Sequence, residues 1–310
     1  MTYLRPLPSI EGHRLAGGWL RFDRVEVLVR DAPPRIVPVA DLTTDDLAPL
    51  LAPRPDIAGV SMARPQVMGV LNVTPDSFSD GGRHLDPEDA VAHAARLAAA
   101  DILDIGGEST RPGAPETPAE VQADRILPVI AALRDRTISV DTRHAEIARA
   151  AVAAGARLVN DVSGLRFDDG MAAAVAELGT GLCITHSIET PATMQYDPRY
   201  ADVLLDVYDA LADRIAVAVA AGIPKDRIVA DPGIGFGKTE AHNLALLRRI
   251  GLFHGLGVPL LLGVSRKGLI GRIGDATSPA DRMPGTLAIT LAAVAQGVQM
   301  HRVHDVAEVA

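Results

Sequence analysis

The stretch Ile138–Asp161, ISVDTRHAEIARAAVAAGARLVND, contains one complete structural repeat. A short apolar run ends at Asp141, an alanine-rich segment follows at 144–154, and a second apolar run ends at Asn160 and Asp161. Short runs rich in β-branched residues predict buried strands, and the alanine-rich segment predicts a helix. A strand, a helix and a second strand in this order are typical of a parallel sheet.

The same alternation extends over the rest of the chain after residue 65. We expect strands at Gln66–Val73, Ile102–Gly106, Ile138–Thr142, Leu158–Ser163, Gly181–Ser187, Ile228–Gly233, Pro259–Ser265 and Met300–Asp305. We expect helices at 86–100, 119–133, 144–154, 168–178, 199–221, 240–250 and 279–296. Eight strands in strict alternation with seven helices predict an α/β fold of the (β/α)₈ or TIM-barrel type for residues 66–310.

An open, doubly wound sheet is the alternative fold with the same alternation. It is disfavoured because no glycine-rich dinucleotide-binding turn follows the first strand. The last helix of the barrel is also in question, because only five residues follow Asp305, where an eighth helix would normally cover the final strand. We therefore expect that the final barrel helix is missing or that another element covers this strand.

Residues 1–65 have a different pattern from the barrel. Prolines cluster there, at positions 33, 34, 38, 53 and 55. Trp19–Arg30 partly alternates between apolar and polar residues, and Arg35–Ala40 has the composition of a returning strand after a proline-containing turn. These patterns predict a small β-rich extension built on a β-hairpin.

Composition and charge argue against several classes of function. The net charge of −9 and the pI near 5.5 argue against a general surface for nucleic acid or for anionic membranes. No window approaches the roughly 18 uncharged apolar residues of a membrane span, and no signal peptide is evident. The only cysteine, Cys183, cannot form an intramolecular disulfide, which fits a reducing cytoplasm.

Polar residues stand at the end of every expected strand. One acidic residue at a strand end is more often a helix cap than a functional group, but eight strand ends out of eight are hard to explain in that way. In this fold the functional groups lie at the carboxyl ends of the strands, so we expect one common site. The residues at these strand ends are Asn72, Asp104, Asp141, Asn160, Asp161, Thr185, His186, Ser187, Asp231, Ser265, Arg266, Lys267, Arg302 and His304.

Strand alternation assigns these side chains to faces. Arg302 and His304 are two residues apart and share a face, whereas Asp161, His301 and Asp305 point the other way and are left out of the site. The pair Arg302-x-His304 offers donors suited to a phosphate or diphosphate. The acceptors and the amide of Asp141, Asn160 and Asp231 suit a flat heterocycle that carries several N–H groups.

The segment 233–239, GIGFGKT, resembles a nucleotide-binding P-loop but fails the pattern. The first glycine of that motif would fall on Pro232, so a nucleotide triphosphatase is disfavoured. The glycines are expected to shape a loop that presents Phe236 to an aromatic substrate. The histidines show no metal-binding spacing, and the acidic strand ends suit at most a weak magnesium site completed by substrate phosphates.

Several of these segments together resemble the dihydropteroate synthase family, in its order, from about residue 66 to 305. The first two motifs below are highly specific, whereas the last alone would be weak. The segments are MGVLNVTPDSFSDGG at 68–82, DIGGESTRPG at 104–113, SVDT at 139–142, NDVS at 160–163, DPGIGFGK at 231–238, SRK at 265–267 and RVHD at 302–305.

The resemblance implies a reaction and its residues. The enzymes join (7,8-dihydropterin-6-yl)methyl diphosphate to p-aminobenzoate and release diphosphate in folate biosynthesis. By resemblance, the pterin is held by Asp141, Asn160, Asp231 and Lys267, with Asp104 nearby. The diphosphate is bound by Asn72, Arg111, Arg302 and His304, with Val303 between the last two, and Asn72 acts through Mg²⁺. The p-aminobenzoate pocket is bordered by Thr110, Pro112, Phe236 and Lys267. The catalytic set is Asp104, Asp141, Lys267 and Arg302.

The resemblance also implies a homodimer and a target of sulfonamides, and it leaves two alternatives open. A pterin-binding methyltransferase domain would share the barrel and the acidic pterin site, but it would not need Arg302, His304 or Lys267. A non-catalytic pterin-binding paralogue is motivated by Thr185, where the family usually has methionine, and by Gly268, where it often has serine or arginine.

Overall fold

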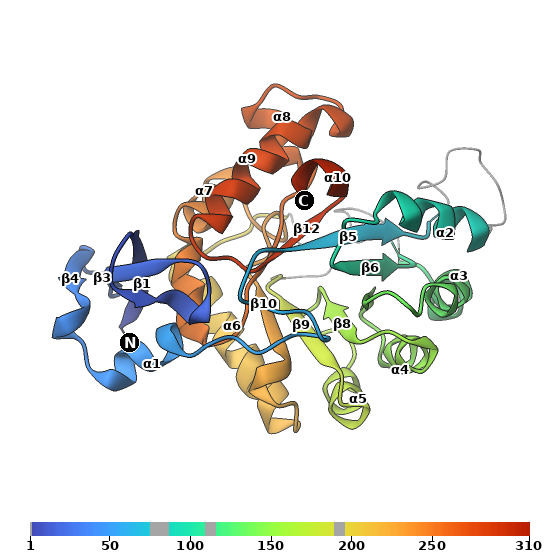
Figure 1. Cartoon of the computed structure of the whole chain (residues 1–310), viewed down its shortest axis with the longest axis horizontal. Helices are drawn as coiled ribbons and strands as arrows, with labels where there is room; N and C mark the ends of the chain where they lie inside the picture. The colour runs from blue at the N-terminus through green and yellow to red at the C-terminus, as the bar shows by residue number, and fades with distance from the viewer. Residues whose placement is uncertain (1, 75–86, 109–115, 189–195) are drawn as a thin grey trace.

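The barrel expected for the larger part of the chain is present. The computed structural model describes residues 2–74, 87–108, 116–188 and 196–310 (Figure 1). Its eight parallel strands are β5 (Gln66–Asn72), β6 (Ile102–Gly106), β7 (Ile138–Asp141), β8 (Leu158–Asp161), β9 (Gly181–Thr185), β10 (Ile228–Asp231), β11 (Leu261–Gly263) and β12 (Met300–Val303).

The strand order shows that the sheet closes on itself. Hydrogen-bonded neighbours follow the order β10-β9-β8-β7-β6-β5-β12-β11, and every pair is parallel. An isolated parallel bridge between Ala230 and Leu260 joins the two ends, where the Ala230 amide donates to the Pro259 carbonyl at 2.9 Å. The prediction of a (β/α)₈ barrel is confirmed, and the open-sheet alternative is excluded.

Helices surround the barrel on its outside (Figure 1). All seven predicted helices are found, as α2 (Pro87–Arg96), α3 (Ala119–Ala132), α4 (Ala145–Ala154), α5 (Met171–Leu178), α6 (Val203–Ala220), α7 (Glu240–Arg248) and α9 (Met283–Val294). The sequence did not predict the short α8 (Gly268–Ile273), because two glycines in six residues hide its helical pattern.

A single helical turn takes the place of the eighth barrel helix. It is α10 (Val306–Val309), which follows β12. Val306 is buried, and a Cβ placed on Gly69 of β5 would lie 3.0 Å from its Cγ2. The missing side chain at Gly69 therefore lets this one turn pack closely on the barrel.

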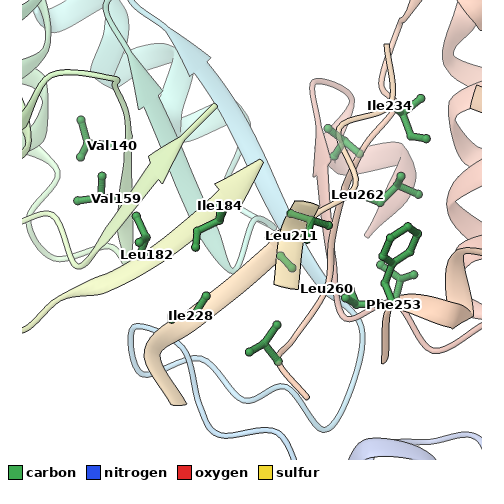
Figure 2. Packing of buried hydrophobic residues seen from close by; sticks show 14 of the residues in the cluster. Val140, Val159, Leu182, Ile184, Leu211, Ile228, Ile234, Phe253, Leu260 and Leu262 are labelled. Atoms are coloured by element: carbon green, nitrogen blue, oxygen red, sulfur yellow. The ribbon is translucent and has the colours of Figure 1, made fainter. Parts of the chain in front are cut away.

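Two apolar layers hold the barrel together. The outer layer lies between strands and helices, and Figure 2 shows part of it, including Leu182, Ile184, Ile228 and Leu211 of α6. The inner layer consists of inward-pointing side chains, together with Ile57 and Met62 from the segment that precedes β5. Its strand residues are Met68, Ile102, Leu158, Cys183, Val229, Leu261 and Met300.

The segment before β5 contains more structure than the predicted hairpin. The expected strands form the antiparallel pair β3 (Arg21–Leu28) and β4 (Arg35–Pro38). However, β1 (Tyr3–Ser9) and β2 (His13–Arg14) also pair with β3, and α1 (Thr44–Leu51) follows. The hairpin prediction is therefore corrected to a four-stranded sheet. Two prolines hide β1 in the sequence, and they are tolerated because β1 pairs on one side only.

Ion pairs and hydrogen bonds attach this extension to the barrel. Glu26 accepts from Arg5 at 2.6 Å and from Arg249 of the barrel at 3.1 Å. Arg30 pairs with Asp206 and Asp209 of α6, at 2.7 Å each. These contacts fix the sheet against the outside of the barrel. None of the helices in the described ranges is long and apolar enough to span a membrane.

We predict that Leu158→Ala destabilises the protein strongly. Leu158 is fully buried in the inner layer, so the truncation should lower the free energy of unfolding by about 2–5 kcal/mol. Urea denaturation followed by circular dichroism measures the change. Ile10→Ala, at a residue that is 93% exposed, is the control and should stay within about 0.5 kcal/mol of wild type. Equal losses in both variants would contradict a packed inner layer.

Candidate active site

Strand alternation places a polar layer directly above the inner apolar layer. Residues two positions apart on a strand point to the same side, so each apolar inner residue is followed by a second inward residue nearer the carboxyl end. On five strands this second residue is polar, namely Asp104, Asn160, Thr185, Asp231 or Arg302, and on β7 Asp141 follows the buried Ser139. The sequence therefore builds a polar floor at the end of the barrel where the expected site lies.

Arg302 links the acidic residues of this floor. Its Nε donates to Asp104 Oδ2 at 2.6 Å, and its Nη2 donates to Asp141 Oδ2 at 2.7 Å. Asn160 Nδ2 also donates to Asp104 Oδ2, at 3.1 Å. The four side chains come from β12, β6, β7 and β8, so the closed barrel brings together residues that are distant in the chain.

Three oxygens in this cluster receive no hydrogen bond from any residue in the described ranges. They are Asp104 Oδ1, Asp141 Oδ1 and Asn160 Oδ1, and all three are buried. A buried acceptor left without a donor costs about 1–3 kcal/mol. The cluster therefore offers acceptors to a ligand with several N–H groups, as the sequence predicted for Asp141 and Asn160.

The loop after β10 carries the next group of residues. The Gly233 amide donates to Asp231 Oδ1 at 2.7 Å, which fixes that carboxylate. Lys267 Nζ donates to the Ile234 carbonyl and lies 4.5 Å from the centre of the Phe236 ring. Gly235 has a positive φ and faces Lys267, so a side chain there would contact the lysine. The structure thus brings Asp231, Phe236 and Lys267 together.

Burial shifts the pKa values of these groups. Burial raises the pKa of Asp141 to about 7, against the opposing effect of Arg302. Burial also raises the pKa of Asp231, while nearby Lys267 lowers it. The pKa of Lys267 is lowered by burial to about 8, although Asp231 opposes this. For Arg302, burial disfavours the charge, but Asp104 and Asp141 outweigh it and raise the pKa. Perturbed groups gathered in one place are typical of active sites.

The rim of the site holds Asn72 and His304. A Cβ on Gly106 would lie 3.6 Å from Asn72 Oδ1 and 3.3 Å from Asp141 Cβ, so this glycine leaves the space between them open. His304 Nδ1 and the His304 amide both lie 3.0 Å from Ser265 Oγ. The hydroxyl therefore holds the histidine at the end of β12.

The side chain of one predicted contact residue lies away from the Arg302 cluster, and three predicted residues lie outside the described residues. Val303 was expected to contact substrate, but its side chain is buried in the outer layer. This follows from strand alternation, because Val303 stands between Arg302 and His304. Thr110, Arg111 and Pro112 fall in the range 109–115, which the structure does not describe.

The residues left out of the site lie outside the Arg302 cluster. Asp305 pairs with Arg266, and Asp161 accepts from the amides of Ser163 and Leu165 in the turn after β8. The P-loop interpretation also fails. Lys238, which would bind phosphate, is 3% exposed and its ammonium is used by protein acceptors.

A buried ion pair that includes Glu108 of the motif at 104–113 was not predicted from the sequence. Arg143 donates to Glu108 with distances of 2.9 Å and stacks at 4.1 Å on the Phe167 ring. Glu108 Oε1 also accepts from the Thr117 amide at 3.1 Å. The Glu108 carboxylate therefore connects the residue before the segment 109–115 to Thr117, which follows that segment, and to Arg143. Nothing in the sequence links Glu108 to Arg143, because they lie on different strand–helix units.

A separate cavity of about 390 Å³ opens at the opposite end of the barrel. It is lined by Arg157, Thr180 and Arg227 near the starts of β8, β9 and β10, and by Ile57 from the preceding segment. It lies far from the Arg302 cluster along the barrel. The candidate active site is therefore identified by the polar residues of that cluster and not by this cavity. The described residues contain no group of three or more His, Cys, Asp or Glu side chains that could hold a metal.

Comparison with known proteins gives a consistent match. The family model described as pterin binding enzyme matches residues 68–304. The dihydropteroate synthase of Escherichia coli strain K12 is 44% identical over 254 residues, which cover 80% of this chain and 89% of that protein.

Solved structures of dihydropteroate synthases show the same likeness. The Xanthomonas albilineans enzyme with 4-aminobenzoic acid is 47% identical with a TM-score of 0.77, over 83% of this chain and 94% of that chain. A structure in complex with 7,8-dihydropteroate from the same organism has 45% identity and a TM-score of 0.75, with 83% and 95% covered. The Yersinia pestis enzyme with a sulfonamide drug complex has 44% identity and a TM-score of 0.76, with 81% and 92% covered.

We predict that Arg302→Met lowers the stability in a pH-dependent way. The variant leaves Asp104 and Asp141 buried without their shared cation, which should cost about 3–5 kcal/mol at about pH 8. The raised pKa of Asp141 lets that carboxyl take up a proton as the pH falls. The loss should therefore shrink at about pH 5.5.

Urea unfolding of both proteins at the two pH values measures this difference. Arg30→Met is the matched control, because its ion pairs with Asp206 and Asp209 are part-exposed. It should cost no more than about 1 kcal/mol at either pH. A loss in Arg302→Met that does not change with pH would contradict the assignment of a buried, uncompensated Asp141.

Proposed function

We propose a function from one premise: the chain belongs to the pterin-binding enzyme family and, within it, to the dihydropteroate synthases. The enzyme condenses (7,8-dihydropterin-6-yl)methyl diphosphate with p-aminobenzoate. The products are 7,8-dihydropteroate and diphosphate, in folate biosynthesis. The observation that carries this proposal is the set of buried oxygens without donors on Asp104, Asp141 and Asn160.

A pterin ring supplies the donors that these oxygens lack. Its amino and ring N–H groups fit Asp141, Asn160 and Asp231, and Lys267 can donate to its carbonyl. Arg302 now covers Asp104 and Asp141. Pterin binding therefore requires that the guanidinium give up at least part of this contact and turn towards the ligand. An arginine plane can stack on a flat ring while it donates to an anion.

The leaving diphosphate meets Arg302 of the floor and His304 of the rim. Arg302 and His304 share a face of β12, and Arg111 is expected to join them by resemblance. The oxygen of Asn72 fits Mg²⁺, which binds few protein oxygens and completes its shell with water and substrate phosphates. When bound, Mg²⁺ would neutralise charge on the diphosphate oxygens. Asn72 would then hold the diphosphate end of the substrate at the rim.

The reaction needs no nucleophile from the protein. The aniline nitrogen of p-aminobenzoate attacks the pterin methylene carbon, the C–O bond breaks and its electron pair leaves with diphosphate. The nitrogen then loses one proton. The carboxylates of Asp104 and Asp141 stabilise positive charge that develops at the pterin during this step. Phe236 and Lys267, with Thr110 and Pro112, border the p-aminobenzoate and hold its nitrogen in line.

The alternatives fit the site less well. A methyltransferase domain would not need Arg302 and Lys267 beside the pterin acceptors. A non-catalytic paralogue was motivated by Thr185 and Gly268. Thr185 is buried in the polar layer, and Gly268 stands at the first position of α8, where backbone N–H groups are available to a carboxylate.

We predict release of diphosphate that depends on both substrates and on magnesium. Wild-type protein with pterin methyl diphosphate, p-aminobenzoate and Mg²⁺ should release one diphosphate per pteroate formed, and EDTA should abolish release. Lys267→Ala should lower kcat/KM for p-aminobenzoate by at least about a hundredfold. Lys225→Ala, the same change at the amino-terminal end of β10, should retain wild-type turnover.

Two results would contradict this function. One is the absence of diphosphate release by folded wild-type protein, and the other is full activity in Lys267→Ala. Sulfanilamide should raise the apparent KM for p-aminobenzoate without raising that for the pterin. Competition with the pterin instead would place the aromatic pocket elsewhere.

A homodimer through helix α9 is part of the proposal. Residues 283–296 contain no charged side chain, and Ala288, Leu291, Ala292 and Ala295 are exposed along one side. A helix that is apolar on every side is normally buried. A second copy of the chain would cover this side of α9. We also propose a cytoplasmic location, supported by the single buried Cys183, which subcellular fractionation tests.

We predict that Leu291→Glu produces monomers. Leu291 is 58% exposed, and a charge at the centre of the α9 face should oppose its burial between two copies. Light scattering should give about half the wild-type mass at equal low-micromolar concentration. Ile10→Glu, at a more exposed residue of the extension, should leave the mass unchanged. Equal masses for both variants and wild type would contradict this interface.

A further inference from the structure

Lys238 is a buried cation that the proposed reaction does not use. It stands at the end of the loop between β10 and α7 and is 3% exposed. Its Nζ lies 2.9 Å from the Gly233 carbonyl, 3.0 Å from the Phe236 carbonyl and 2.9 Å from His186 Nδ1. The His186 carbonyl is a fourth neighbour, at 3.3 Å. No described carboxylate forms an ion pair with it.

Three polar atoms surround the Lys238 amino group at 2.9–3.0 Å, and an ammonium group has three N–H donors. Burial lowers the pKa of His186 well below its usual value, so its ring is neutral. Burial also lowers the pKa of Lys238 well below its usual value, and Asp231 opposes this effect. Lys238 is therefore a buried lysine that connects a neutral histidine to two loop carbonyls.

The loop that Lys238 holds also determines the position of Lys267. The Ile234 carbonyl accepts from Lys267, and the Phe236 ring lies against the same ammonium. The two carbonyls bound by Lys238, those of Gly233 and Phe236, lie on either side of Ile234 in the chain. Gly233, Gly235 and Gly237 all have positive φ, so the backbone of this loop has no regular structure of its own.

We propose that Lys238 is a positioning residue for the aromatic substrate. Through Gly233, Phe236 and His186, it holds the loop in the one conformation that places the Ile234 carbonyl and the Phe236 ring under Lys267. In this conformation the Lys267 ammonium lies between Asp231 and the p-aminobenzoate pocket. This proposal rests on the proposed function for its substrates, but the geometry of Lys267 can be tested without turnover.

Other side chains hold the loop at different points. Tyr200 Oη donates to the Gly237 carbonyl at 2.8 Å, and Asn243 Oδ1 accepts from the Gly235 amide at 2.7 Å. Neither contacts Gly233 or Phe236. Lys238 alone among these three connects the two sides of Ile234 to a neighbouring strand, since His186 follows β9. Its removal should therefore release the loop from β9 while leaving the other contacts in place.

The first test compares Lys238→Met with Lys225→Met. Methionine keeps the unbranched apolar stem and removes the donors. We expect folded Lys238→Met to lose at least about tenfold in kcat/KM for p-aminobenzoate, mainly through a higher KM, with pterin binding less affected. Lys225→Met should match wild type in both.

The second readout is the pKa of Lys267, measured by carbon-13 NMR after reductive methylation. Lys225, Lys238 and Lys267 are the only lysines of the chain, so the signals can be assigned by substitution. Lys267 should titrate near its lowered pKa of about 8 in wild type. In Lys238→Met its pKa should rise towards the ordinary value, because a loosened loop exposes the ammonium to water.

The variant His186→Phe separates two effects on the pKa of Lys267, namely movement of the loop and loss of the Lys238 charge. It removes one acceptor of Lys238 without changing the net charge of the site, so a rise in the pKa of Lys267 there reports movement of the loop. If Lys238→Met does not fold, this variant decides the question. Unchanged kcat/KM and an unchanged Lys267 pKa in a folded variant would overturn the proposal. If wild type releases no diphosphate, the proposed function fails, and the pKa measurement still decides the positioning role.

Discussion

The alternation of side chains along parallel strands is the constraint on which this site depends. Seven of the eight strands contribute one residue to the inner apolar layer, and in β6, β8, β9, β10 and β12 the next inward residue is polar. Leu158 and Asn160 of β8 show the relation, as do Met300 and Arg302 of β12. The same two-residue period that builds the core therefore builds the floor of the site, and a register shift of one residue would turn both layers outward.

The floor contains more negative than positive groups, and this excess favours a ligand that donates hydrogen bonds. Asp104 and Asp141 share one guanidinium, so a single cation compensates two carboxylates. Burial holds the pKa of Asp141 near 7, which shows how weakly Arg302 alone offsets the cost of its charge. A ring with several N–H groups would supply donors where the protein leaves oxygens without them. The buried oxygens of the floor therefore favour the binding of a ring that carries several N–H groups.

The sequence predicted those features that depend on local order along the chain. All eight strands and seven helices follow from periodicity, and the polar residues at strand ends include Asp104, Asn160 and Arg302, which the barrel brings together. Alternation places the Val303 side chain outward in the outer apolar layer, and its contact with substrate stays a prediction. Strand β1 was missed because Pro6 and Pro8 mask its pattern. The pairs Glu108–Arg143 and Lys238–His186 could not be found, since closure of the barrel, and not sequence spacing, brings them together.

The other end of the barrel contributes to the electrostatics of the site. Ile57 and Met62, both at most 1% exposed, extend the inner apolar layer below the strands. The cavity at that end is lined by Ile57 and by residues near the starts of β8, β9 and β10. The low-dielectric floor that shifts the pKa values of Asp141 and Lys267 is thus maintained by apolar residues contributed in part by the segment before β5.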